Sequence, residues 1–171
     1  AHAALYHRYN LKRDLKDNKL CGVFTHQCYF AHGALTRGFD DTFLVPHSRY
    51  GHIDIDKINA CEELVVLAGS ERVGAYLLKN KSGSPVFITG HPEYDADSLK
   101  AEYERDLQKS PDAPKPENYF PDDDTSKQPS KTWQSHAFLL FSNWLNYYVY
   151  QTTPYDINLV SQDVRTNNYA E

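Results

Sequence analysis

A histidine and a glutamate separated by one residue are the side chains in this sequence best suited to acid–base chemistry. They are His91 and Glu93, in the segment Gly90-His91-Pro92-Glu93. An imidazole titrates near neutral pH, so it can accept and return a proton within one catalytic cycle. A neighbouring carboxylate fixes its tautomer and stabilises the imidazolium. The pair therefore predicts a general base and the acid that orients it, and what it lacks is a nucleophile.

The residues before this pair indicate how it is positioned. The apolar run 85–88 predicts a strand buried on both faces, as in a parallel sheet, and the Gly-His-Pro sequence ends that strand. Open parallel sheets bind ligands just beyond the carboxyl ends of their strands. We therefore expect His91 and Glu93 at the rim of a sheet. In an extended chain a spacing of two points both side chains the same way. The spacing alone also fits a surface or structural pair.

The elements around the pair follow from local patterns. Short apolar runs predict further strands at 21–26, 42–45, 64–68 and 74–78, with a polar turn at 17–20. Pro46 is expected to stop the strand 42–45, which would put His47-Ser48-Arg49 just past a strand end. Helices are expected at 1–9, 96–108 and 132–151, and we expect the many aromatic residues of the last one to pack broadly into the core. The proline-rich stretch 110–130 predicts a long surface loop.

Composition limits the classes of protein to consider. The 171 residues, of which 40% are hydrophobic, suffice for one domain with a core. A net charge of -5 and a pI of about 5.9 argue against nucleic acid as the main partner. No apolar run could span a bilayer and no signal-peptide pattern opens the chain, so we expect a cytoplasmic protein without a membrane partner.

The cysteines and histidines offer little further chemistry. Cys21, Cys28 and Cys61 have neither CxxC nor zinc-ligand spacing, which fits free thiols in a reducing compartment. Cys21, near the start of a strand, could be a nucleophile, but a small buried thiol is the commoner case. No HxxxH or HExxH pattern occurs, so we expect no metal site.

Two polar residues remain open between a binding and an ordinary role. Ser48 lies between His47 and Arg49 without a G-x-S-x-G elbow, so it is either a ligand-contacting hydroxyl or a turn serine. Arg105 could clamp a substrate carboxylate through two hydrogen bonds. From spacing alone, a solvated helix residue is the better interpretation of Arg105.

Several longer motifs together resemble the homoserine O-succinyltransferases of bacterial methionine biosynthesis. The resemblance runs from Ala1 to about Asp156, and it rests on Gly38-Phe39-Asp40-Asp41, Pro46-His47-Ser48-Arg49-Tyr50, Thr89-Gly90-His91-Pro92-Glu93-Tyr94-Asp95, Asn118-Tyr119-Phe120-Pro121 and Asn143 to Gln151. It implies an α/β, flavodoxin-like fold of the class I glutamine amidotransferase type, a three-layer sandwich that is only partly present here.

The resemblance also implies a reaction and a site. Such enzymes pass an acyl group from acyl-CoA to a cysteine and then to the hydroxyl of L-homoserine, with no other cofactor. A thioester intermediate splits one acyl transfer into two easier steps. His91 takes the position of the general base and Glu93 that of its orienting acid, while the substrate contacts fall on Lys19, Ser48 and Arg105. A homodimer is a further expectation.

One part of the family pattern is incomplete. The nucleophile belongs to a Cys-Trp-x-x-Gln-Ala-Ala-Leu motif, of which only the end is present as Ala1-His2-Ala3-Ala4-Leu5, with His2 in place of the glutamine. We therefore expect residues 1–156 to be the C-terminal portion of one acyltransferase domain and 157–171 to be a polar tail. The nucleophile would lie upstream, and the chain alone should lack acyl transfer.

Alternatives to a succinyltransferase stay open at this point. The same mechanism with acetyl-CoA is one, because the acyl pocket would lie largely upstream. A non-catalytic remnant without the nucleophile is another. A third alternative is a glutaminase-type amidotransferase, which uses the same set of catalytic Cys, His and Glu residues but lacks the long motifs.

Overall fold

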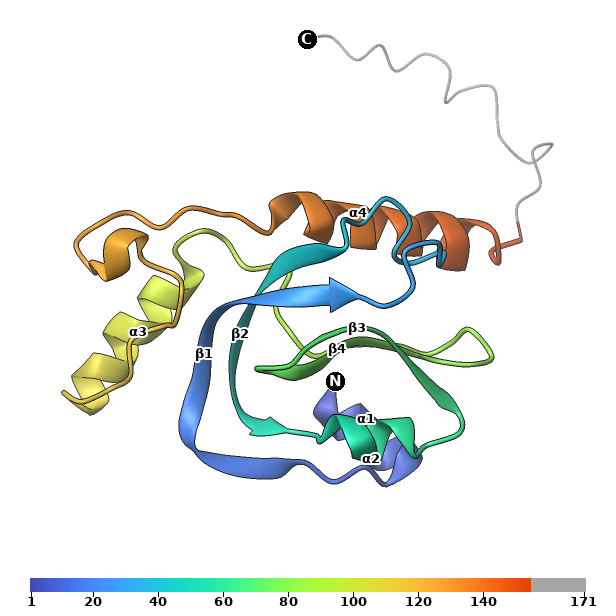
Figure 1. The fold of residues 1–171 in the computed structure, drawn as a ribbon, viewed down its shortest axis with the longest axis horizontal. Helices are drawn as coiled ribbons and strands as arrows, with labels where there is room; N and C mark the ends of the chain where they lie inside the picture. The colour runs from blue at the N-terminus through green and yellow to red at the C-terminus, as the bar shows by residue number, and fades with distance from the viewer. Residues whose placement is uncertain (155–171) are drawn as a thin grey trace, which may run out of the picture.

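A curled antiparallel sheet with helices on both faces organises residues 1–154, the part of the chain that the computed structural model describes (Figure 1). The predicted tail 157–171 lies outside the described residues. The strands follow the order β2-β1-β3-β4-β5, with bounds β1 Asp14–Cys28, β2 Thr42–His52, β3 Leu64–Ser70, β4 Gly74–Asn80 and β5 Val86–Ile88. The helices are α1 His2–Tyr9, α2 Ile55–Asn59, α3 Ser98–Lys109, the 3-10 turn η1 Pro121–Asp123, α4 Gln134–Trp144 and the π-helical η2 Leu145–Tyr150.

Two apolar clusters on opposite faces of the sheet make the three layers. On one face Leu5 of α1 and Ile58 of α2 pack with Leu78 and Phe87 of the sheet. On the other face Leu140 of α4 packs with a cluster that includes Leu67, Tyr76 and Leu77. A third cluster joins Leu99 of α3 to Cys21 and Val23 of β1. The expected three-layer α/β arrangement is therefore present, with α3 placed to one side of the sheet (Figure 1).

The expectation of a parallel strand at 85–88 was wrong. β5 pairs antiparallel with β4 and stands last in the order of the described sheet. Only Phe87 is fully buried, whereas its neighbours Val86 and Ile88 are half-buried. The physical reason is the short connection from Asn80 to Val86, because parallel neighbours need a crossover of a dozen residues or more. The segment that contains His91 and Glu93 nevertheless follows the carboxyl end of β5, as expected.

Pro46 does not end a strand, which corrects a second expectation. β2 continues through it to His52, so Ser48 lies within the strand rather than beyond it. In the described sheet β2 has a partner on one side only, namely β1. The Pro46 carbonyl accepts a hydrogen bond from the His91 N–H at 2.8 Å, so this backbone position faces away from β1. A proline is tolerated there because no ladder hydrogen bond is lost.

The remaining elements match their predictions to different degrees. The helices at 1–9 and 96–108 and the strands at 64–68 and 74–78 are confirmed, each within two residues at either end. The predicted turn 17–20 is instead an irregular part of β1, where the register against β2 shifts between Leu15 and Leu20.

The aromatic segment 132–151 is helical, but its expected broad burial was wrong. Trp133 is buried, with 1% of its surface exposed, whereas Phe138 is 71% and Tyr150 67% exposed. Phe141 and Trp144 are also exposed. A helix lying on a sheet can bury only one side, and here aromatic residues occupy the other side as well.

The loop after α3 is fastened to β1 by a close backbone approach. Val23 N donates to Glu117 O, and Glu117 N donates to Cys21 O, both at 2.9 Å. Between them Gly22 has φ +148°, and a Cβ there would lie 2.3 Å from Glu117 O. Only glycine therefore permits this contact.

Gly22→Ala should lower the free energy of unfolding by about 3 kcal/mol, since the methyl group strains the backbone and collides with Glu117. The matched control is Gly83→Ala. Gly83 also has a positive φ, +106°, but a Cβ there meets nothing within 4 Å, so strain alone should cost about 1 kcal/mol. Urea unfolding of both variants measures the difference, and equal losses would contradict the steric argument.

Candidate active site

The two side chains of the predicted acid–base pair are in contact. His91 and Glu93 lie in a turn after β5, in which Tyr94 N donates to His91 O at 3.2 Å. The His91 Nδ1–H donates to Glu93 Oε1 at 2.9 Å, so the turn rather than an extended chain brings the two side chains together. About one third of the imidazole and half of the carboxylate side chain are exposed, 34% and 56%. This tautomer leaves Nε2 as the basic nitrogen of the ring.

The backbone of this turn is seated on β2. The His91 N–H donates a hydrogen bond to Pro46 O. Gly90 packs against the side chains of Val45 and His47. A Cβ on Gly90 would come within 2.7 Å of Val45 and 3.0 Å of the His47 ring. A hollow of about 270 Å³ lies beside the turn, lined by Arg49, Thr89, Gly90 and His91 together with the start of the chain. His91 therefore has its main chain held against β2 and borders an open hollow.

A charged cluster joins β1, β2 and α3 close to this pair. Lys19 Nζ lies 2.9 Å from Glu102 Oε2 and 2.7 Å from Asp106 Oδ2. Ser48 Oγ donates to the same Glu102 oxygen. Arg105 is half-exposed and pairs with Asp106 at 3.0 Å. The three substrate contacts implied by the resemblance thus meet at one place, around Glu102.

The cluster fixes the charge of its members. Burial by itself would raise the pKa of Glu102, but hydrogen bonds from Ser48, Tyr94 and Lys19 hold it below its ordinary value. Burial would likewise lower the pKa of Lys19, but hydrogen bonds to Asp106 and Glu102 raise it. Both groups are therefore charged at neutral pH. The cluster offers both signs of charge in one place, which suits a zwitterionic ligand.

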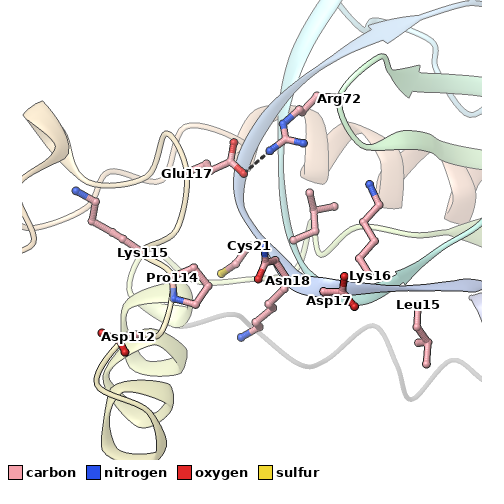
Figure 2. A pocket seen from close by; sticks show the side chains of 12 residues that line it. Leu15, Lys16, Asp17, Asn18, Cys21, Arg72, Asp112, Pro114, Lys115 and Glu117 are labelled. Carbon is pink, nitrogen blue, oxygen red and sulfur yellow. Dashed lines mark hydrogen bonds and ion pairs between the residues drawn. The ribbon is translucent and has the colours of Figure 1, made fainter.

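Cys21 borders this cluster but is poorly suited to attack an acyl group. Its side chain is buried, 6% exposed, and burial raises the pKa of its thiol to about 11. A thiol, rather than the nucleophilic thiolate, is therefore present at neutral pH. It lines a surface hollow of about 640 Å³ between β1 and the loop after α3, whose lining also includes the Arg72–Glu117 ion pair (Figure 2). This favours the interpretation of Cys21 as a structural thiol.

A buried histidine pair lies behind the turn. The His26 Nδ1–H donates to Phe24 O at 2.9 Å, so its Nε2 must accept from His47 Nε2–H, 3.1 Å away. Both rings have no exposed surface. Burial lowers the pKa of His26 to about 4 and that of His47 well below its ordinary value. The pair is therefore neutral, and its His47 ring packs against Gly90.

The structure adds three residues to the site that the sequence did not predict. These residues are Glu102, Asp106 and Tyr94. Tyr94 belongs to the site because its Oη donates to Glu102 Oε1 at 2.6 Å. Two acidic residues four apart on a predicted helix share a face, and that spacing was the available signal for Glu102 and Asp106. Nothing in the sequence paired that face with Lys19, more than 80 residues away. Within residues 1–154, no group of three or more potential ligand side chains could hold a metal ion.

Comparison with known proteins identifies the family of this chain. A family model described as homoserine O-succinyltransferase matches residues 1–155. The chain belongs to this family. It is 88% identical to a homoserine O-succinyltransferase of Pseudoalteromonas translucida over 171 residues, which are 100% of this chain and 54% of the relative. It is also 49% identical to a homoserine O-acetyltransferase of Petrotoga mobilis, across 96% of this chain and 53% of that protein. The chain thus spans about half the length of the curated relatives it matches.

The fold also has relatives among solved structures. A glutamine amidotransferase of Thermotoga maritima superposes with a TM-score of 0.50 at 15% identity, covering 78% of this chain and 53% of that one. The fold class predicted from the sequence, of the class I glutamine amidotransferase type and partial, is therefore confirmed. Each helix among the described residues is too short or too polar to cross a bilayer.

Stability should fall on mild acidification because the buried histidine pair is neutral. The folded-state pKa of His26 is about 4, below its unfolded value near 6.5. The unfolded chain therefore binds more protons between these values, and stability drops as pH falls through 6.5 toward 4. At pH 5 His26 alone should cost about 2 kcal/mol relative to pH 7. Urea unfolding at both pH values measures the loss.

Two variants separate this pair from other titrating groups. His26→Gln should be less stable at pH 7 but should lose less between pH 7 and pH 5. His32→Gln, at an exposed histidine, should keep the full loss. A wild-type pH dependence in His26→Gln would show that another group is responsible.

Proposed function

We propose that the protein containing this chain transfers a succinyl group from succinyl-CoA to the hydroxyl of L-homoserine. The observation that carries the proposal is the His91–Glu93 pair, formed at 2.9 Å in a chain whose family match spans residues 1–155. The name and high identity of the Pseudoalteromonas translucida relative favour succinyl as the acyl group. Acetyl transfer is the second candidate, supported by the name of the Petrotoga mobilis relative.

In this proposal the reaction proceeds in two acyl transfers. A cysteine thiolate attacks the thioester carbon of acyl-CoA, the CoA thiolate leaves, and an acyl-enzyme thioester remains. The homoserine hydroxyl then attacks this thioester, its proton passes to His91 Nε2, and the cysteine sulfur leaves as thiolate. Glu93 holds the Nδ1–H tautomer and stabilises the imidazolium. Because Cys21 is buried with a raised pKa, the proposal places the nucleophile elsewhere in the protein.

The charged cluster would orient homoserine. The carboxylate of an amino acid requires a cation, which Arg105 or Lys19 provides, and its ammonium requires an anion, which Glu102 provides. Ser48, on β2, is hydrogen-bonded to Glu102. Arg105, with its side chain 55% exposed, is the member most accessible to an incoming carboxylate. We place the reaction in the cytoplasm and expect the protein to act as a homodimer.

His91→Ala should lower kcat for homoserine succinylation by about two orders of magnitude or more, since it removes the general base. The assay follows CoA thiol release in the complete protein, with succinyl-CoA and acetyl-CoA compared side by side. The control is His7→Ala on α1, an exposed histidine that should leave kcat unchanged. Near-normal turnover of His91→Ala would remove His91 from the mechanism, and a preference for acetyl-CoA would replace succinyl as the donor.

Arg105→Ala should raise KM for homoserine about tenfold while leaving KM for succinyl-CoA unchanged, because it removes one charge-assisted contact to the substrate carboxylate. Steady-state kinetics with each substrate varied in turn measures the effect. Lys109→Ala removes an exposed cation from the same helix and should change neither constant. An unchanged KM in Arg105→Ala would make this residue a surface arginine.

A further inference from the structure

One aromatic ring contacts both halves of the candidate site. The Tyr94 ring stacks on His91, with centroids 4.4 Å apart and planes at 17°. Its hydroxyl donates to Glu102 Oε1 at 2.6 Å. The other oxygen of Glu102 receives Lys19 and Ser48. The acid–base pair and the charged cluster therefore share one side chain.

The ring is itself held firmly from its main chain. Tyr94 N closes the turn onto His91 O, and Tyr94 O accepts from the indole N–H of Trp133 at 3.0 Å. Trp133 is 1% exposed and lies in the apolar cluster beneath α3. The tyrosine is thus fixed on one side by a tight turn and on the other by a buried anchor.

Stacking restrains a motion that the hydrogen bond to Glu93 leaves open. A single Nδ1 hydrogen bond fixes one atom of the imidazole, but the ring can still rotate about the axis through that bond. A flat partner 4.4 Å away opposes such rotation, because tilting the imidazole would bring it into the tyrosine ring. With the ring plane fixed, Nε2 keeps a constant direction toward a reacting hydroxyl.

We propose that Tyr94 is a positioning residue of this site, whose ring fixes the plane of His91 and whose hydroxyl fixes Glu102 relative to it. The inference rests on the proposed acyl transfer. It assigns two roles to one side chain. The ring orients His91, and the hydroxyl orients Glu102, the group proposed to bind the substrate ammonium. Burial and the hydrogen bond to Glu102 raise the pKa of Tyr94, so the hydroxyl remains a donor throughout the working pH range.

Two substitutions separate the roles. Tyr94→Phe keeps the stack and loses the hydrogen bond, so KM for homoserine should rise about tenfold while kcat stays within about twofold of wild type. Tyr94→Leu loses the stack as well, so kcat should also fall about tenfold or more. The kinetics are measured on the complete protein. Equal kcat values in the Phe and Leu variants would overturn the role of the ring.

A second readout does not depend on turnover. Ring current from Tyr94 should shift the His91 Cε1–H and Cδ2–H proton resonances upfield, and this shift should persist in Tyr94→Phe but disappear in Tyr94→Leu. Tyr103→Leu is the matched control, because Tyr103 packs half-buried against the same apolar cluster and should leave the His91 signals unchanged. Unaltered His91 signals in Tyr94→Leu would overturn the stack. Failure of the proposed acyl transfer would appear instead as the absence of CoA thiol release by the wild-type complete protein with either acyl-CoA.

Discussion

Lys19 of β1, with only one tenth of its side chain exposed, pairs with carboxylates of α3, and the arrangement of the site depends on how its charge is neutralised. A buried ammonium is costly unless it is paired and hydrogen-bonded. Lys19 has two carboxylates, Glu102 and Asp106, and Arg105 balances the second of them. The charges of the four groups cancel. α3 must therefore present one defined face to β1, and that face carries Glu102 to Tyr94.

Short-range features of this site could be predicted from the sequence, whereas its long-range contacts could not. His91 and Glu93 are two residues apart, so a turn suffices to join them, and their chemistry is evident from their types. The meeting of Lys19 with Glu102 spans 83 positions and depends on where α3 lies against the sheet. No local pattern encodes that placement. The family resemblance pointed to Lys19, Ser48 and Arg105 as substrate contacts. Glu102, which contacts all three, became evident only from the structure.

The incorrect predictions about the fold also have local causes. An apolar run such as Val86 to Ile88 indicates a buried strand but not its direction, which is set by the length of the connection to the strand beside it. The aromatic residues around α4 indicate apolar surface but not which side meets the sheet. Pro46 was expected to end a strand because proline disrupts ladders, and the outward direction of its backbone removes that conflict.

That same proline has a consequence for how the molecule meets its neighbours in solution. Within the described residues β2 is an edge strand, and an edge strand offers backbone groups to which an extended segment of another molecule can add. Pro46 has no backbone N–H to donate to an added segment, and its carbonyl already accepts a hydrogen bond from the His91 N–H. The hydrogen bond that holds the His91 turn against β2 therefore also occupies the backbone acceptor that an added strand would need at this position.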